Sequence, residues 1–495
     1  MLETTDTLQG AYLPETTQAL RRANMLSIVA ALLLASFYLA TSLYISSHRL
    51  LWIDEVLTAF YTRLPAWTDI WKASTKGGDG LPPTYFMVVR MFDNWFGHDD
   101  FSLRLPSALA MTAGLLLTFD CARRLTDGLH GLIALAVLSC SFLPYYGHEA
   151  RSYALYFMLA ALALWVWTCT KSDKRWSAVL FGAVLFLGIA MHYYAILCLV
   201  PYAVWEISNW KPWRLPSLKM IAGVLGVTCA AALLWAPIQA GRQVFAPDNW
   251  QRPNFDTLRT AFADLFPDGL FLLALVVVWI AWTAVKDRVT PLPPMQPSER
   301  VGWFFFLIPL AGYLLGQFAH AFQLRYVIGT LPGVAIAFSC WLWRHFHGGA
   351  LRVSVGVFLI LATAGLAKQV LAARDPGRGY YSPIRQVIGM ETPLRGDGKQ
   401  FFVFCNQSRY MEALQYSKHP QDYALLMLAD PRQMRELTTL AQYYPMQLWT
   451  LEDLKKHAQQ TALLVPLQSN LDTLQRAGFE TTTRFGQPLT VVYLK

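Results

Sequence analysis

Long apolar runs separated by short polar segments fill the first three quarters of the chain. The first run, residues 25–46, has the length of about 20 residues that a helix needs to cross a bilayer, and Arg21 and Arg22 precede it. It lacks the small-residue cleavage pattern of a signal peptide, so we expect a retained span that enters from the cytoplasm. Similar runs predict about eleven transmembrane helices in all. The further predicted spans are residues 105–122, 128–146, 153–170, 176–193, 196–208, 220–236, 265–285, 301–318, 326–343 and 353–370.

Lysine and arginine residues mark every second loop between these spans. If the N-terminus is cytoplasmic, each inner loop carries Lys or Arg, as the positive-inside rule requires, and the C-terminus lies outside. The segment "PPTYFMVVRMFDNWFG" is short and carries Arg90 and Asp93, so it predicts an amphipathic interfacial helix rather than a span. The basic residues of the expected inner loops are Arg123, Arg124, Lys171, Lys174, Arg175, Lys211, Arg214, Lys219, Lys286, Arg288, Arg300, Arg344 and Arg352.

The last quarter of the chain has a different pattern. Short apolar stretches such as "QFFVFC", "PMQLWTL", "TALLVPL" and "PLTVVYL" alternate with helical patterns such as "LEDLKKHAQQ". This alternation is typical of a small α/β domain. We therefore expect a transmembrane domain over residues 1–372, with a first outer loop over about 47–104, and an extracytoplasmic α/β domain over 373–495.

Composition supports a membrane protein. Hydrophobic residues make up 55% of the chain and charged residues 15%, which is too apolar for an ordinary soluble protein. The net charge of +9 comes from clusters between apolar runs rather than from one basic face, so we expect no nucleic acid partner. The seven cysteines show neither a disulfide framework nor zinc spacing.

Two adjacent carboxylates, Asp54 and Glu55, lie in the apolar stretch "LLWIDEVLTAF" just past the outer end of the first span. The following loop is rich in Trp, Phe and Tyr, as interfacial helices are. Such helices would hold the acidic pair at the membrane surface, where a lipid-linked reactant presents its head group.

Further polar residues are expected at the same outer level. Ionisable residues at the membrane boundary are usually functional, so their convergence predicts a shared outer-face site. They come from "YYGHEARSYAL", "MHYY" and "QLRY", and they are His148, Glu149, Arg151, Tyr153, His192, Arg325 and Tyr326.

The strings "WIDEVLTAF", "PPTYF", "FGHDDFSLRLPSALA", "HEARSYAL" and "RYVIGTLPG" follow one another between about residues 51 and 332. In this order they resemble the bacterial polyprenyl-phosphate-sugar-dependent membrane glycosyltransferases, which are related to protein O-mannosyltransferases and to the aminoarabinose and galacturonic acid transferases of lipid A. The resemblance implies a GT-C fold with many spans, juxtamembrane helices and often an extracytoplasmic C-terminal domain, in the inner membrane of a bacterium. It also implies that Asp54 is a catalytic base or metal-site carboxylate and that Arg325 and Tyr326 bind the lipid phosphate.

The sequence departs from these relatives in two places. Relatives commonly have a His before the paired prolines, where this chain has "GGDGLPP" with Leu81, and related branches have a second Asp where this chain offers His148 and Glu149. His148, Glu149 and His192 are therefore candidates for a second acidic or metal cluster, and a divalent cation is left open as a cofactor.

The resulting hypothesis is transfer of a sugar from polyprenyl phosphate to a hydroxyl. Arg151 and Arg325 would grip the departing phosphate, with Tyr153 and Tyr326 beside them. Neighbouring residues in a helix point about 100° apart, so we expect Asp54 to be the general base and Glu55 to pair with an arginine or orient substrate. Direct attack would invert the anomeric carbon.

The acceptor is expected to be lipid A, lipopolysaccharide or another cell-envelope glycan. A protein O-glycosyltransferase with the same donor is the nearest alternative. A transporter of the lipid-linked sugar is less consistent with the sequence, because no internal repeat is visible and the polar clusters lie at span ends. A scaffold without catalysis would not explain the acidic and basic clusters at one level.

Overall fold

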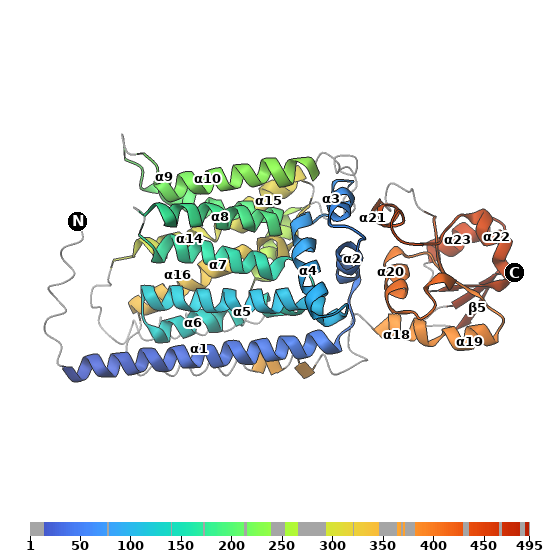
Figure 1. Ribbon diagram of the computed structural model, residues 1–495, viewed down its shortest axis with the longest axis horizontal. Helices are drawn as coiled ribbons and strands as arrows, with labels where there is room; N and C mark the ends of the chain where they lie inside the picture. The colour runs from blue at the N-terminus through green and yellow to red at the C-terminus, as the bar shows by residue number, and fades with distance from the viewer. Residues whose placement is uncertain are drawn as a thin grey trace.

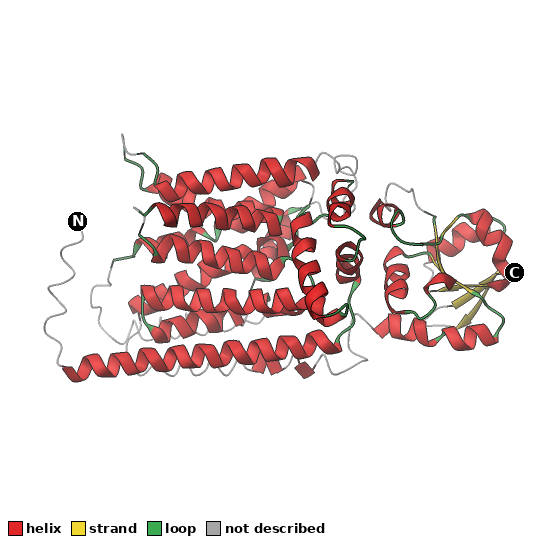
Figure 2. Cartoon of the chain, viewed as in Figure 1, coloured by secondary structure: helices red, strands yellow, loops and turns green. Residues whose placement is uncertain are grey.

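The protein consists of a long helical bundle and a smaller domain at one end of it, as the computed structural model shows (Figure 1). All strands that the structure describes lie in the smaller domain (Figure 2). The structure describes residues 14–76, 79–139, 141–171, 174–211, 215–238, 253–265, 294–319, 321–345, 364–367, 370–371, 382–428, 435–464, 468–485 and 491–494.

The bundle is built from apolar helices that lie side by side (Figure 1). Their bounds are α1 (Pro14–His48), α5 (Asp100–Leu125), α6 (Gly128–Ser139), α7 (Tyr153–Cys169), α8 (Arg175–Met191), α9 (Val200–Ser208), α10 (Leu218–Ala230), α12 (Phe255–Ala263), α14 (Pro297–Phe304), α15 (Leu307–Ala319) and α16 (Leu331–His345), with a π-helical turn η3 (Ala231–Trp235) after α10.

Among the described residues, five helical segments are long and apolar enough to cross a membrane, and four shorter apolar helices accompany them. All of them coincide with predicted spans. The predicted spans 265–285 and 353–370 lie mostly outside the described residues, so the total of about eleven stays a prediction. The five long segments are Arg22–His48, Asp100–Leu125, Leu218–Ile238, Pro297–Ala319 and Leu324–Arg344.

Three short helices lie across one end of the bundle, between it and the smaller domain (Figure 1). We call the end of the bundle that these three helices cover the capped end. The helices are α2 (Ile53–Thr62), α3 (Trp67–Thr75) and α4 (Pro83–Phe96), so the segment in which interfacial helices were predicted is helical, while its place at the outer membrane surface stays a prediction. Proline at the start of α4 fits a position that needs no N–H partner, and Gly97, at φ 107°, ends the helix. Arg63 after α2 binds Asp93 of α4 through two contacts of 3.1 Å, which ties the two helices together.

Several bundle helices are interrupted at the capped end by short 3₁₀ turns. These turns are η1 (Leu143–His148), η2 (Tyr193–Leu199) and η5 (Leu324–Thr330). Irregular backbone at the level of a membrane is tolerated where protein buries it, and each turn carries or adjoins one of the predicted polar clusters. The predicted polar side chains therefore lie in or next to these 3₁₀ turns.

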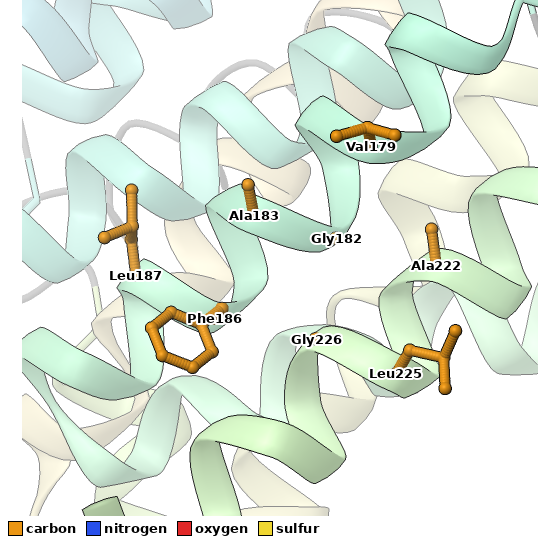
Figure 3. Close-up of a pocket in the computed structure, with 8 residues that line it drawn as sticks. All are labelled: Val179, Gly182, Ala183, Phe186, Leu187, Ala222, Leu225 and Gly226. Carbon is orange, nitrogen blue, oxygen red and sulfur yellow. The ribbon is translucent and has the colours of Figure 1, made fainter. Parts of the chain in front are cut away.

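The helices α8 and α10 approach each other closely because both carry glycine at the contact. A Cβ atom added at Gly226 would lie 2.2 Å from the carbonyl oxygen of Gly182, so no larger residue fits without separating the helices. Beside this contact an open groove of about 490 Å³ runs along the bundle surface (Figure 3). Its lining is Val179, Gly182, Ala183, Phe186, Leu187, Ala222, Leu225 and Gly226. With no polar side chain among them, the groove offers no group for chemistry.

The C-terminal domain is a six-stranded sheet in the order β3-β2-β1-β4-β6-β5. The first four of these strands are parallel, and β6 and β5 are antiparallel to their neighbours. The strands are β1 (Phe401–Phe404), β2 (Tyr423–Leu426), β3 (Leu448–Trp449), β4 (Thr461–Leu464), β5 (Thr481–Phe485) and β6 (Val491–Leu494). The helical segments are α18 (Ser382–Gly389), α19 (Glu391–Gly396), α20 (Gln407–Tyr416), η6 (Pro420–Asp422), α21 (Arg435–Leu440), α22 (Leu451–His457), η8 (Ala458–Gln460) and α23 (Gln468–Arg476).

The predicted small α/β fold is therefore present, although β2 and β5 were not among the strands predicted from the sequence. The central strands are buried on both sides, with Val403 and Leu463 fully covered, as parallel strands between helices are. The predicted boundary at residue 372/373 lies outside the described residues and stays a prediction.

Candidate functional site

Asp54 and Glu55 stand in the first turn of α2 and point into different surroundings. Glu55 is fully buried, whereas the Asp54 side chain keeps 21% of its surface exposed. A bound ligand can therefore reach Asp54 but not Glu55. The sequence led us to expect different roles for the two residues, but it did not show how far each is buried.

Glu55 is held in a dense set of hydrogen bonds. Arg104 of α5 binds its two carboxylate oxygens at 2.7 Å each, and Arg49 binds Oε2 at 3.0 Å. The backbone N–H groups of Trp52 and Ala150 donate to the same carboxylate, at 3.2 and 2.7 Å. Both oxygens are fully used, which leaves no free acceptor for a substrate.

Arg104 extends this network to the turn between α1 and α2. It is fully buried, and its Nη1 donates to the carbonyl of Ser46 at 3.0 Å, while Nη2 donates to that of Leu50 at 2.9 Å. In the sequence, Arg104 stands at the end of the expected first outer loop, residues 47–104, and it was not among the candidate site residues. A lone arginine at the start of an apolar run was the signal that could have identified it.

The network determines the charge of Glu55. Burial alone would raise its pKa, but the positive charges of Arg104 and Arg49 and their hydrogen bonds outweigh this and lower the pKa to about 2. Glu55 is therefore a permanent anion that stabilises the turn, and it is unsuited to exchange protons at neutral pH.

Asp54 faces two arginines from different parts of the bundle. Its Oδ2 lies 3.3 Å from Nη2 of Arg325, which η5 carries, and 3.9 Å from Nε of Arg151, which precedes α7. Arg151 also donates to the backbone carbonyl of Asp54 at 3.1 Å. The structure thus brings the predicted acidic residue and both predicted phosphate-binding arginines into one place.

Asp79 is a second carboxylate at this site that the sequence analysis did not select. It is nearly buried, its Oδ2 lies 3.4 Å from Nη1 of Arg151, and its Oδ1 accepts the N–H of Leu81 at 2.9 Å. It belongs to the string "GGDGLPP", which was noted only for lacking a histidine. Arg151 is consequently bracketed by Asp54 and Asp79.

Aromatic rings surround the second arginine. The guanidinium carbon of Arg325 lies 5.7 Å from the ring centre of Trp52 and 5.6 Å from that of Tyr153. Stacking of this kind holds the planar guanidinium while leaving its N–H groups to bind oxygen. Tyr153 therefore contacts the site through its ring.

His192 and Tyr326 lie next to this group and pack mainly on other rings. His192 stacks on Tyr156 at 5.3 Å with an interplanar angle of 12°, and its Nδ1 accepts the N–H of Tyr194 at 3.2 Å. Tyr326 packs against His192 and Tyr194, at 5.4 and 4.9 Å. His192, Tyr156, Tyr194 and Tyr326 thus form one aromatic cluster next to Arg325 and Arg151.

His148 and Glu149 are buried on the other side of α2, and their proton affinities are strongly altered. Burial, with the charges of Arg49 and Arg104, lowers the pKa of His148 well below its usual range. Burial, with the charge of Glu55, raises the pKa of Glu149 to about 7 against the opposing effect of Arg49. His148 is thus neutral at pH 7, and Glu149 titrates near it.

The expected metal cluster of His148, Glu149 and His192 is not formed. Within the part of the chain that the structure describes, no three His, Cys, Asp or Glu side chains lie close enough to hold a metal ion. The reason is geometric, because His192 is stacked among tyrosines while His148 lies beside Arg49 and Arg104. Asp54 and Asp79 each face a guanidinium group, whose positive charge would repel a bound cation.

Taken together, the bundle, the helices across its end and the carboxylate between two arginines define the class of GT-C membrane glycosyltransferase folds. Residues 81–235 match the family described as dolichyl-phosphate-mannose-protein mannosyltransferase. The chain also superposes on the crystal structure of ArnT from Cupriavidus metallidurans bound to undecaprenyl phosphate, with a TM-score of 0.60 and 14% identity over 95% of this chain and 97% of that one. For the apo structure of the same ArnT, the TM-score is 0.61, with 13% identity over 94% and 97% of the chains.

These likenesses confirm the predicted GT-C fold and the resemblance to ArnT and to the protein mannosyltransferases. They also confirm a multi-pass membrane protein. No curated protein sequence matches this chain. At such low identity the superposition establishes the fold, while the roles of individual residues and the substrates rest on the site itself.

Proposed function

We propose that this protein is an inverting glycosyltransferase that moves a sugar from a polyprenyl-phosphate donor to a cell-envelope acceptor such as lipid A, lipopolysaccharide or another glycan. The observation that carries the proposal is the placement of the partly exposed Asp54 carboxylate between Arg325 and Arg151, at 3.3 and 3.9 Å. The similarity to ArnT supports the donor class, because one of the superposed ArnT structures contains undecaprenyl phosphate.

The two arginines suit the departing phosphate. A phosphate leaves without a proton but gains negative charge as the glycosidic bond breaks, and guanidinium groups bind such oxygens through two parallel N–H bonds. Arg325 is stacked on Trp52 and Tyr153, and Arg151 is held by Asp79, so both donors are already oriented before a ligand arrives.

Donor binding also changes the surroundings of Asp54. Without a ligand, the Asp54 carboxylate balances the arginine charges. When a phosphate takes over Arg325 and Arg151, the carboxylate is released from the ion pair and can accept the proton of an attacking hydroxyl. A hydroxyl that attacks the anomeric carbon opposite the phosphate inverts the configuration, and no second carboxylate is needed for the leaving group.

The orientation in the membrane follows the same proposal. The capped end would face the outer surface of a bacterial inner membrane, with the N-terminus in the cytoplasm and the C-terminal domain outside. A topology reporter fused to each terminus of the full chain tests this, and an extracytoplasmic N-terminus would contradict it.

The decisive experiment uses purified protein in lipid nanodiscs with a polyprenyl-phosphate sugar. Lipid A, glycan and peptide acceptors are offered separately, and release of free polyprenyl phosphate is measured. Release that depends on a lipid or glycan acceptor supports the proposal, dependence on the peptide indicates protein O-glycosylation, and no release with any acceptor refutes it. The Asp54→Asn variant should lose transfer, whereas Asp256→Asn, an exposed carboxylate on α12, should retain it.

A further inference from the structure

The turn that leads from α1 into α2 is held from two sides. Arg104 satisfies carbonyl groups of this turn from inside the bundle, as described above. From outside, the N–H of Leu51 donates to the hydroxyl of Tyr416, at 2.5 Å. Leu51 is fully buried and stands three residues before Asp54.

Tyr416 is the last residue of α20 and belongs to the C-terminal domain. Its hydroxyl accepts from Leu51 and donates to Oδ2 of Asp100, in the first turn of α5, at 2.7 Å. One hydroxyl thus joins the C-terminal domain, the turn before α2 and the helix that carries Arg104. Burial and the neighbouring carboxylate raise the pKa of Tyr416, so the hydroxyl keeps its proton and remains a donor to Asp100.

The same domain touches the other end of α2. The hydroxyl of Tyr444 donates to the carbonyl of Phe60 at 2.7 Å, and the two rings meet edge to face at 4.9 Å. The helices α20 and α2 pack directly against each other (Figure 1). The domain is therefore docked along the helix that presents Asp54.

We propose that Tyr416 is a positioning residue for Asp54, through which the C-terminal domain sets the geometry of the active site. Asp54 must lie within hydrogen-bond reach of the acceptor hydroxyl, and small displacements of a catalytic group reduce rates strongly. Tyr416 acts on the backbone that leads into α2 and does not touch Arg325 or Arg151. Its loss should slow the proton transfer step while leaving donor binding intact. This inference rests on the proposed transferase function.

The test compares Tyr416→Phe with two matched variants of the full chain in nanodiscs. Tyr444→Phe removes a hydroxyl at the other end of α2, and Tyr493→Phe removes a hydroxyl that binds Asp397 at 2.7 Å away from α2. For Tyr416→Phe we expect kcat to fall on the order of tenfold, since the buried Leu51 and the half-buried Asp100 both lose their hydrogen bond, with an unchanged KM for the donor. Amide exchange of Leu51 should accelerate by a similar factor. Both control variants should keep kcat within about twofold and leave Leu51 exchange unchanged.

Faster amide exchange at Leu51 with a normal kcat in Tyr416→Phe would overturn the inference. An equal loss of kcat in the two control variants would also overturn it, as would a change confined to the KM for the donor. Failure of the proposed function is distinguishable from these outcomes, because the wild-type protein itself would then release no polyprenyl phosphate. Hydrogen exchange at Leu51 reports on the hydrogen bond whether or not sugar is transferred.

Discussion

Glu55 and Asp54 are adjacent carboxylates, and the structure predicts different effects when each is replaced by its amide: mainly a loss of stability for Glu55 and a loss of activity for Asp54. Glu55→Gln keeps the shape of the side chain but removes its charge. Arg104, which is fully buried, and Arg49, whose side chain is 10% exposed, then lose their counterion, and an amide N–H₂ group faces their donors. We expect this variant to be less stable than the wild type, and we expect Asp54→Asn to lose less stability but to be inactive, because Asp54 is partly exposed and Arg151 keeps its contact with Asp79.

The size of the effect follows from the proton affinity of Glu55. A pKa lowered from 4.5 to about 2 corresponds to about 3 kcal/mol of folding free energy at neutral pH. This agrees with the cost of roughly 3–5 kcal/mol for removing one partner of a buried ion pair. Because the pKa of the folded state is the lower one, this stabilisation is fully present above about pH 4.5 and is lost as the pH falls toward 2.

The assay is thermal unfolding in detergent micelles, followed by tryptophan fluorescence between pH 4 and 8. Glu55→Gln should lower the apparent Tm by roughly 3–10 °C by an amount that is constant above pH 5 and shrinks below it. Asp54→Asn should lower the apparent Tm by less than Glu55→Gln does, because Asp54 is partly exposed and Arg151 keeps its contact with Asp79, while transfer falls by about 10²- to 10⁴-fold. A wild-type Tm for Glu55→Gln, or a difference that grows on acidification, would refute the assignment of Glu55 to the buried network.

Further predictions concern three other positions. The wild type should lose stability as the pH rises from about 4.5 to 7, because the raised pKa of Glu149 means that folding favours its protonated form. Glu149→Gln should abolish this loss, and equal slopes of Tm against pH for the two proteins would contradict the prediction. Arg325→Lys should raise the KM for the donor by about 10-fold or more, because a lysine neither stacks on Trp52 nor binds two phosphate oxygens at once; an unchanged KM in the transfer assay would exclude that role. Gly226→Ala should cost roughly 1–3 kcal/mol, because the new Cβ would meet the carbonyl of Gly182, and a Tm equal to that of the wild type would show that α8 and α10 can separate freely.

The architecture was largely accessible from the sequence. Hydrophobic spans, interfacial aromatic helices and the α/β pattern of the last quarter are all local signals, since each depends on residues close together in the chain. The predicted spans coincide with apolar helices wherever the structure describes them. The strands β2 and β5 were not predicted, although β1, β4 and β6 are about as short and were predicted.

The site was predictable as a list of residues but not as an arrangement. The sequence placed Asp54, Arg151 and Arg325 at one level of the membrane, because span ends fix the depth of neighbouring residues. It separated Asp54, the expected base, from Glu55, the expected partner of an arginine, but it could not name Arg104 as that partner, because Arg104 lies 49 residues further along the chain. It also proposed His148, Glu149 and His192 as a possible metal cluster, but among the described residues the structure shows no group of three such side chains that could hold a metal ion.

The apolar segments, the charged loops and the residues near the membrane surface could all be read from the sequence, because the burial of apolar side chains along a helix is a property of each segment alone. The folded chain was needed to show that Glu55 is buried in an ion-pair network, that Asp79 contacts Arg151 and that Tyr416 of the C-terminal domain reaches the turn before Asp54. Those facts depend on the lateral packing of helices and on contacts between residues as far apart as Leu51 and Tyr416. Packing of that kind is fixed by the fit of many side chains at once, and no local pattern records it.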